Sequence, residues 1–326
     1  MKFDFISIGG STRDISFFTD QGVLINNKKD LLRKELLAFE YGAKIKINKF
    51  HYTFGGGAAN TAVNFANFGF KTACLTMVGD DINGSLIIKN LKNKKVNTKL
   101  IKKNKEVDSG FSFILISSSG ERIIFTERGA NNNFKLSERD LRNLRQTKNI
   151  YLVSLSGAWE ENLQKIFSVE KIKGPKISWN PGEAQYAAGA KKIGQYLKKT
   201  YVFAVNKDEA IELAMGIKKY KSQNKSFFNN TKKLLTLIYE LGPKIVVITD
   251  GKNGVDVYDG KAYYHKNIKT EKKKVDTTGV GDIFNSSFVS GLELFAGDIN
   301  KALELGLKNT ASKIAHLGAQ NGLIKL

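Results

Sequence analysis

Strands and helices alternate from about residue 150 to residue 249, and this alternation constrains the fold more than any other feature. Apolar runs typical of buried strands lie near 150–155, 176–179, 201–205 and 244–249. Segments with helical spacing lie near 160–169, 187–198, 207–215 and 230–241. Such an order favours a mainly parallel sheet with helices on both faces. We therefore expect an α/β fold, to which residues 3–8 add a strand.

Near the C-terminal end, a glycine-rich turn leads directly into an apolar helical segment. The turn is Asp276-Thr277-Thr278-Gly279-Val280-Gly281-Asp282, and residues 283–295 have helical spacing. Glycines let a ligand approach the backbone, and the free N–H groups at a helix start favour an anion. Asp282 lies at the same place and could accept a proton from a hydroxyl during phosphoryl transfer. The alternative is an ordinary helix start in which Asp282 is a favourable first-turn charge.

Polar residues near the first strand are candidates for substrate contacts. Asp14 follows that strand, and α/β folds bind ligands beyond the carboxyl ends of strands. It is either an acceptor for sugar hydroxyls or a turn residue. The run Gly55-Gly56-Gly57 opens a helix that contains Asn60. Glycines leave the backbone uncovered and the Asn60 amide offers both a donor and an acceptor, so this stretch favours contact with a small polar ligand. The third glycine of a dinucleotide loop is missing, which argues against a nicotinamide- or flavin-dependent oxidoreductase.

A second pair of polar residues begins a later helix. Asn206 and Glu209 are three residues apart, on one side of the helix start. They suit either a hydrated Mg²⁺ near phosphates or a capping box. The three histidines, His51, His265 and His316, share no metal-ligand spacing.

The regions before the parallel sheet are less regular. Strand-like pieces occur at 15–18, 43–47 and 51–54, and residues 109–116 and 121–127 are typical of a hairpin around 118–120. Residues 15–53 suit a cover or an accessory sheet better than a core. No internal repeat is found.

The net charge of +21 raises the possibility of a nucleic-acid-binding protein. Only seven of the 52 basic residues are Arg, however, and the Lys residues are scattered in pairs and triples. Because bidentate contacts to bases and phosphates rely on Arg, we favour a solvated Lys-rich surface. No apolar run approaches the length of a membrane span. Residues 72–78, which contain the single cysteine, Cys74, are typical of a buried strand. One cysteine and no signal peptide suggest a cytoplasmic protein.

Taken together, these stretches resemble the ribokinase-like (PfkB) carbohydrate kinase family. The first family signature is matched by Gly55, Gly56, Asn60, Gly69 and Gly79. The second signature is matched by Asp276, Thr277, Gly279, Gly281 and Asp282. Between them lie the family-like pairs Asn206 with Glu209 and Thr249 with Gly251.

The resemblance implies a three-layer, doubly wound, mainly parallel sheet with a small β lid. It implies one domain over residues 1–326, with the lid at about 15–53 and 109–127. The activity implied is an ATP- and Mg²⁺-dependent transfer to a primary hydroxyl of a small carbohydrate. Paired lids could make a homodimer, and the implied partners are sugar and ATP, without membrane or specific nucleic acid.

The same resemblance implies roles for individual residues. Asp282 would be the general base, and Gly279, Val280 and Gly281 would build the anion hole. The sugar would contact Asp14, Gly56, Gly57 and Asn60. The nucleotide would contact Thr249, Gly251 and Asn309, and Asn206 and Glu209 would order Mg²⁺. A K⁺ ion could lie near Asp276 and the Gly318-Ala319 region.

Several positions depart from the family pattern. Val280 replaces an Ala, and Ser286-Ser287 replaces a pair of smaller residues. Ribokinases tend to have Lys at the position of Gly57 and a Glu near Ser154 and Ser156. The sequence therefore leaves ribose, fructose, a keto-deoxy sugar acid and a nucleoside open as substrates. A basic nucleic-acid-binding protein that reuses the fold remains the non-enzymatic alternative.

Overall fold

The main sheet has eight strands in the computed structural model, which describes residues 2–27, 35–117, 122–169, 174–217, 219, 225–268 and 274–326. Their order is β16-β15-β14-β13-β12-β11-β1-β6. The strands are β1 (Phe5–Ile8), β6 (Thr72–Leu75), β11 (Asn149–Leu152), β12 (Lys176–Trp179), β13 (Val202–Asn206), β14 (Ile245–Thr249), β15 (Val255–Tyr258) and β16 (Tyr263–Lys266). The six strands from β14 to β6 are parallel, whereas β15 and β16 are antiparallel. This arrangement confirms the expected mainly parallel sheet.

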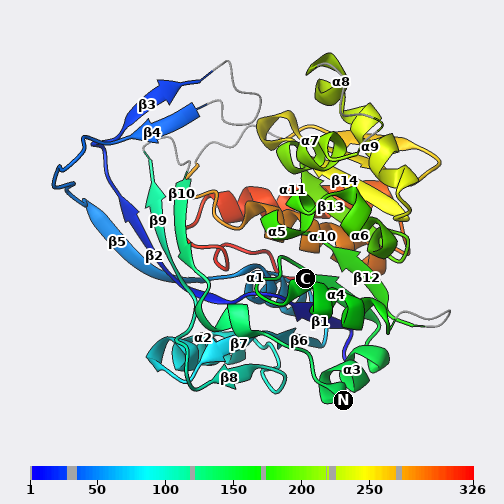
Figure 1. Cartoon of the computed structure of the whole chain (residues 1–326), viewed down its shortest axis with the longest axis horizontal. Helices are drawn as coiled ribbons and strands as arrows, with labels where there is room; N and C mark the ends of the chain where they lie inside the picture. Colours follow the sequence, from blue (N-terminus) through cyan, green and yellow to red (C-terminus); the bar gives the residue numbers. More distant parts are fainter. Residues whose placement is uncertain are drawn as a thin grey trace.

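Helices cover both faces of the main sheet (Figure 1). On one face lie α1 (Gly57–Asn67), α2 (Ile82–Asn93), α10 (Val280–Leu294) and α11 (Ile299–Ile314). On the other lie α3 (Glu138–Gln146), α4 (Trp159–Phe167), α6 (Ala190–Leu197), α7 (Lys207–Met215), α8 (Lys225–Asn229) and α9 (Thr231–Glu240). A short helix, α5 (Glu183–Ala187), follows β12.

The alternation of side chains along each strand feeds two separate cores. In β1, Ile6 and Ile8 pack under α3 and α4, whereas Phe5 stacks on Phe65 of α1 with ring centroids 4.0 Å apart. Successive strand residues point to opposite faces, so a strand covered on both sides is apolar throughout. Cys74 belongs to the core under α1, and burial raises the pKa of its thiol to about 12. The cysteine is therefore an inert core residue.

A second, four-stranded sheet has the order β10-β9-β2-β5, and we call it the small sheet. Its strands are β2 (Thr12–Phe18), β5 (Lys49–Gly55), β9 (Phe111–Ile116) and β10 (Arg122–Glu127). A two-stranded extension, β3 (Val23–Asn26) with β4 (Glu35–Ala38), continues from it. Figure 1 shows these strands, in blue to cyan, standing to one side of the helices that cover the main sheet. Strands β9 and β10 confirm the expected hairpin, whose turn at 118–120 lies outside the described residues.

One local expectation was wrong, and two expected elements differ in their bounds. Residues 43–47 form no strand, and the backbone N–H of Lys46 donates to the side chain of Gln21 instead of to a strand neighbour. The helix expected over 187–198 breaks at Gly189, which has φ +80°. The strand expected over 72–78 divides into β6 and β7 (Met77–Gly79), because β7 pairs with β8 (Lys102–Asn104).

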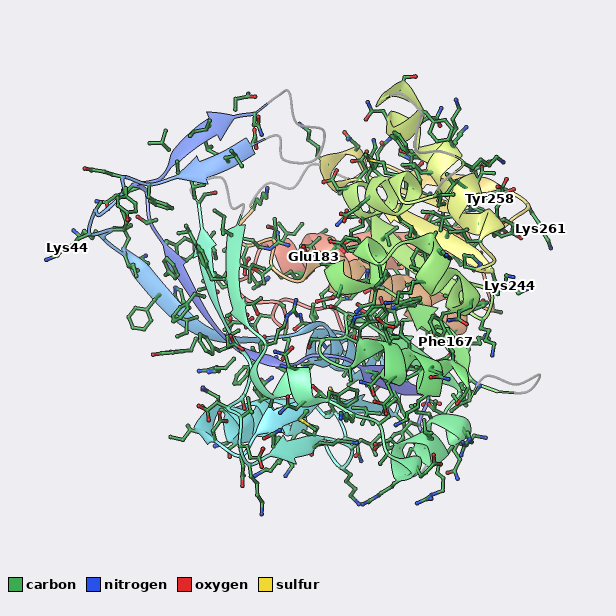
Figure 2. All side chains as sticks on the ribbon, viewed as in Figure 1. Lys44, Phe167, Glu183, Lys244, Tyr258 and Lys261 are labelled. Carbon is green, nitrogen blue, oxygen red and sulfur yellow. The ribbon has the colours of Figure 1, made fainter. Side chains whose placement is uncertain are left out.

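The surface of the molecule is rich in lysine. Figure 2 shows Lys44 at the outer tip of the small sheet, and Lys244 and Lys261 at the opposite edge of the molecule. All three side chains are exposed, and Lys44 lies far from the other two, as expected for a solvated surface. Within the described residues, no helix is both long enough and apolar enough to cross a bilayer.

Candidate active site

A cavity of about 430 Å³ is lined by both sheets. The small sheet contributes residues from β2, β9 and β10, and the main sheet contributes residues at the carboxyl ends of β12, β13 and β14. The lining residues are Thr12, Asp14, Gly55, Gly56, Asn60, Ser112, Ile114, Arg122, Ile124, Thr126, Arg128, Asn180, Asn206, Glu209, Thr249, Thr278, Gly279, Gly281, Asp282 and Asn285. Ligands of α/β folds bind at this edge of the sheet. A second hollow of about 410 Å³, near the ends of α1 and α2, has no acidic side chain in its lining.

The glycine-rich turn begins α10 at one side of the cavity. Gly279 has φ +73°, and a Cβ on it would lie 2.5 Å from the Cβ of Ala319, so only glycine fits. At Gly281 a Cβ would meet no atom, because this residue faces open space. No side chain caps α10. The Val280 N–H donates to the Thr277 carbonyl at 3.2 Å, and Val280 does not line the cavity. Gly279, Gly281 and Asp282 do line it, and N–H groups in the first turn of a helix have no helical partner, so this end suits an anion.

Asp282 lies in the first turn of α10 and is half-buried against the cavity. Asn60 donates from Nδ2 to Oδ2 of Asp282 at 2.8 Å. A Cβ on Gly57 would come within 3.3 Å of the other carboxylate oxygen, so Gly57 lies beside Asp282 without lining the cavity itself. Burial raises the pKa of Asp282, while the Asn60 bond and the charge of Arg122 oppose this rise. A carboxylate with a raised pKa is better matched to accepting a proton.

Across the cavity, Asp14 is almost completely buried at the inner face of β2. Its Oδ1 accepts a hydrogen bond of 2.7 Å from Thr12 Oγ1, and burial raises its pKa to about 6. A Cβ at Gly55 would overlap the Asp14 carboxylate, and Gly56 has φ +85°. Gly55 and Gly56 of the first signature therefore each have a steric reason in this structure.

The amide of Asn60 is fixed from its other side. Its Oδ1 accepts from Gln320 Nε2 at 3.1 Å, and Gln320 Oε1 accepts from Asn90 Nδ2 at 2.7 Å. With Oδ1 occupied in this way, Nδ2 is directed at Asp282. Asn60 therefore links the two signatures, which lie 222 residues apart in sequence.

Asn206 and Glu209 form a capping box and also line the cavity. Asn206 Oδ1 accepts from the Glu209 N–H at 2.9 Å, and Glu209 Oε2 accepts from the Asn206 N–H at 2.8 Å. Burial and nearby acidic groups, Asp282 among them, raise the pKa of Glu209 to about 7. A cation between the carboxylates of Glu209 and Asp282 would relieve the repulsion between their negative charges. The oxygen donors present therefore fit a hydrated Mg²⁺.

The described residues hold no group of three or more His, Cys, Asp or Glu side chains that could bind a metal alone. Any Mg²⁺ here would therefore depend on phosphate oxygens for most of its ligands.

Three of the expected nucleotide contacts differ in position. Thr249, at the end of β14, lines the cavity. Gly251, in the next turn, does not line it. Asn309 is completely buried among helices, where its Nδ2 donates to Asn64 Oδ1 at 2.7 Å and to Ser287 Oγ at 2.8 Å. The structure thus gives Asn309 a role in holding α1, α10 and α11 together and does not bring it to the cavity.

The sequence pattern missed several lining residues. Arg122 reaches from β10 to the glycine-rich turn, where its Nη1 donates to Thr277 Oγ1 at 2.7 Å. Asn180 follows β12 as Asn206 follows β13, so the strand-end rule could have found it. Arg122 and Arg128 had only the scarcity of arginine as a signal.

Three buried polar atoms of the lining have no hydrogen-bond partner among the described residues. They are Arg122 Nε, Thr278 Oγ1 and Asn285 Oδ1. Buried polar groups are nearly always paired, and an unpaired one needs an explanation. All three residues line the cavity, Arg122 from β10 and the other two from the glycine-rich turn and α10, so a polar ligand bound there is one partner that would complete their bonding.

Comparisons with known proteins agree with this geometry. A model of the pfkB family carbohydrate kinases matches residues 27–326. The ATP-dependent 6-phosphofructokinase of Thermoanaerobacterium thermosaccharolyticum is 26% identical, over 93% of this chain and 93% of that protein. The ribokinase of Mus musculus is 29% identical, over 82% of this chain and 79% of its own.

The solved structure of Arabidopsis thaliana ribokinase with ribose and ATP has a TM-score of 0.79 to this chain. It covers 100% of this chain and 96% of its own at 18% identity. That likeness confirms the expected ribokinase-like fold.

Proposed function

Because this chain belongs to the pfkB family of carbohydrate kinases and is a phosphotransferase with an alcohol acceptor, we propose that it transfers the γ-phosphoryl group of ATP to a primary hydroxyl of a small carbohydrate. One observation carries the proposal. The uncapped start of α10 and the Asp282 carboxylate open into the same cavity as the buried Asp14. An anion-binding end beside a basic group is what phosphoryl transfer to a hydroxyl requires.

In the proposed reaction, the sugar oxygen forms a bond to the γ-phosphorus. The bond from that phosphorus to the β–γ bridging oxygen breaks, and ADP leaves. Asp282 accepts the proton of the attacking hydroxyl, which we expect to contribute roughly 10²–10⁴-fold to the rate. The backbone donors of Gly279 and Gly281 stabilise the charge on the transferred group, whereas the Val280 N–H is bonded to the Thr277 carbonyl.

The two sides of the cavity divide the substrates. Asp14, Gly56 and Asn60, which line the cavity, bind the sugar, with Asn60 also orienting Asp282. Gly57, the fourth residue expected to contact the sugar, lies beside Asp282 and outside the cavity lining. The polar residues at the ends of β13 and β14, namely Asn206, Glu209 and Thr249, lie next to the nucleotide. Gly251 is one turn further along the chain and outside the cavity lining. Mg²⁺, when bound with ATP near Asn206 and Glu209, supplies neutralising charge to the phosphates.

We propose that the small sheet acts as a lid over the sugar. It provides one wall of the cavity, and Arg122 already bridges it to the glycine-rich turn. Lid closure excludes water and so protects ATP from hydrolysis.

The outward face of the small sheet exposes Phe50, Tyr52 and Phe125 by 56–60%. This apolar face supports a homodimer through paired lids, which a mass measurement in solution tests.

The acceptor class is a finer question than the reaction. Arg122 and Arg128 line the cavity, although arginine is scarce in this chain. Guanidinium groups bind phosphate and carboxylate oxygens by paired hydrogen bonds. We therefore expect a sugar phosphate or sugar acid to be a better acceptor than a neutral pentose or a nucleoside. Because the basic residues are mostly exposed lysines, we do not expect a specific nucleic-acid site. A protein that uses ATP as co-substrate and has one free, buried cysteine is expected in the cytoplasm.

The test is an ADP-release screen over pentoses, hexoses, their phosphates, sugar acids and nucleosides, with Asp282→Asn and the exposed-site control Asp20→Asn. We expect one class to stimulate ADP release, and Asp282→Asn to lose roughly 10²–10⁴-fold in kcat while still binding ATP. The Asp20 control should match the wild type. Wild-type turnover by a folded, ATP-binding Asp282→Asn protein would contradict the role of Asp282. Failure of every acceptor class would contradict the kinase assignment.

A further inference from the structure

Behind the anion-binding end of α10 lies a lysine that is completely buried. Lys313, on α11, and Asp276, which begins the glycine-rich turn, are both 0% exposed. The ammonium of Lys313 donates to the backbone carbonyl of Asp276 at 2.7 Å and lies 3.8 Å from its Oδ2. Lysine is almost never fully buried unless it is paired, so this contact requires an explanation.

The Asp276 carboxylate fastens two chain segments to each other. Its Oδ1 accepts from the Thr278 N–H at 2.7 Å, and its Oδ2 accepts from the Gly318 N–H at 2.8 Å. Its own N–H donates to the Ile314 carbonyl at 3.2 Å. The residue therefore fixes the turn that leads to Gly279, and Lys313 balances the charge of that anchor.

The family resemblance places a possible K⁺ ion in this same region, so the residues present can be tested against it. An alkali cation would need the carbonyl and carboxylate oxygens of Asp276 as ligands. The carbonyl is already bonded to the Lys313 ammonium, and Arg122 adds a further positive charge nearby. A second cation beside a buried ammonium would be repelled in a region shielded from solvent. The residues present do not fit a bound K⁺.

We propose that Lys313 is a built-in cation that takes the place of a bound monovalent ion and makes this protein independent of K⁺. The lysine is a positioning residue, because it acts on the anion-binding turn through Asp276 and does not touch the cavity. This inference rests on the proposed kinase function where it is tested by ATP turnover. It does not rest on that function where it is tested by ADP binding or thermal unfolding.

The charge state of Lys313 agrees with this role. Burial lowers its pKa to about 8, and the attraction of Asp276 opposes that fall. The ammonium is therefore mainly protonated at pH 7.

The test compares the wild type, Lys313→Ala and Lys313→Met with Lys308→Ala, whose lysine is exposed on the same helix. Each protein is studied in about 100 mM choline, sodium, potassium or ammonium chloride, so that ionic strength is constant. The measurements are thermal unfolding, ADP binding by calorimetry, and ATP turnover with the acceptor found in the screen.

For the wild type and Lys308→Ala we expect turnover and Tm that do not depend on the cation. Lys313→Ala should lose about tenfold or more in kcat in choline. Potassium or ammonium, but not choline, should restore part of that loss and raise Tm by about 2 °C through occupation of the vacated position.

Potassium activation of the wild type by several-fold would overturn the proposal, even if neither Lys313 variant folds. Equal turnover and equal Tm of Lys313→Ala in all four salts would also overturn it. If no acceptor is found, the cation dependence of Tm and of ADP binding still decides the question, so the two proposals can fail separately.

Discussion

The main sheet and the small sheet bury their residues in opposite ways. Strands β1, β6 and β11 are buried at every position, whereas in β10 the side chains from Ile124 to Glu127 are exposed. In the small sheet one face lines the cavity and the other carries solvent-exposed aromatic residues. The main sheet thus fixes the start of α10 by packing, while the small sheet contributes side chains that we expect to serve ligand binding. Substitutions should affect stability in the first region and ligand binding in the second.

The largest expected effect compares the two regions directly. Phe288 of α10 is 0% exposed, whereas Phe50 of the small sheet is 60% exposed. Phe288→Ala should lower the free energy of unfolding by about 3–5 kcal/mol, because it leaves a cavity in the core. Phe50→Ala should change it by no more than about 0.5 kcal/mol. Chemical denaturation of both variants measures the difference, and equal losses would contradict the contrast between the sheets.

Asp14, on the cavity face of the small sheet, should lower the free energy of unfolding because its carboxylate is buried. Its pKa is raised to about 6 by burial, so the ionised form is disfavoured in the folded state. The penalty is absent below about pH 4, grows as the pH rises to about 6, and is constant above. Asp14→Asn should therefore raise the free energy of unfolding at pH 7 by up to about 3 kcal/mol while weakening sugar binding.

Denaturation curves at about pH 4 and pH 7 test this sign. A variant that is less stable than the wild type at pH 7, or equally more stable at both pH values, would show that the Asp14 charge is not the cause.

The smallest of these effects concerns the bridge between the two regions. In the wild type, Arg122 donates from Nη1 to Thr277, while its buried Nε has no hydrogen-bond partner among the described residues. Arg122→Ala removes this guanidinium group. We expect kcat/KM to fall by about tenfold, with Arg122→Lys only partly active because a point charge does not replace the planar fork. The exposed Arg139→Ala is the matched control and should behave as the wild type. A loss of stability without a loss of kcat/KM would mean that Arg122 is only a structural link.

Much of the fold could be predicted because local pattern encodes local backbone. The apolar strands, the helix start at Asn206 and the glycine-rich turn all follow from residues close together in sequence. Asn206 and Glu209 form the capping box that the sequence offered, and the same two residues line the cavity, while the Mg²⁺ site offered as the alternative stays a prediction. The irregular segment at 43–47 was missed because strand propensity does not reveal whether a pairing partner exists.

By itself, the sequence determined the layered α/β fold and the glycine-rich start of α10 with Asp282 in its first turn, because each depends on chemistry within a few consecutive residues. Only the tertiary structure decided that Arg122 meets Thr277, that Asn60 orients Asp282 and that Lys313 pairs with Asp276. These contacts join residues 37 to 222 positions apart, and chain topology rather than local spacing brings them together.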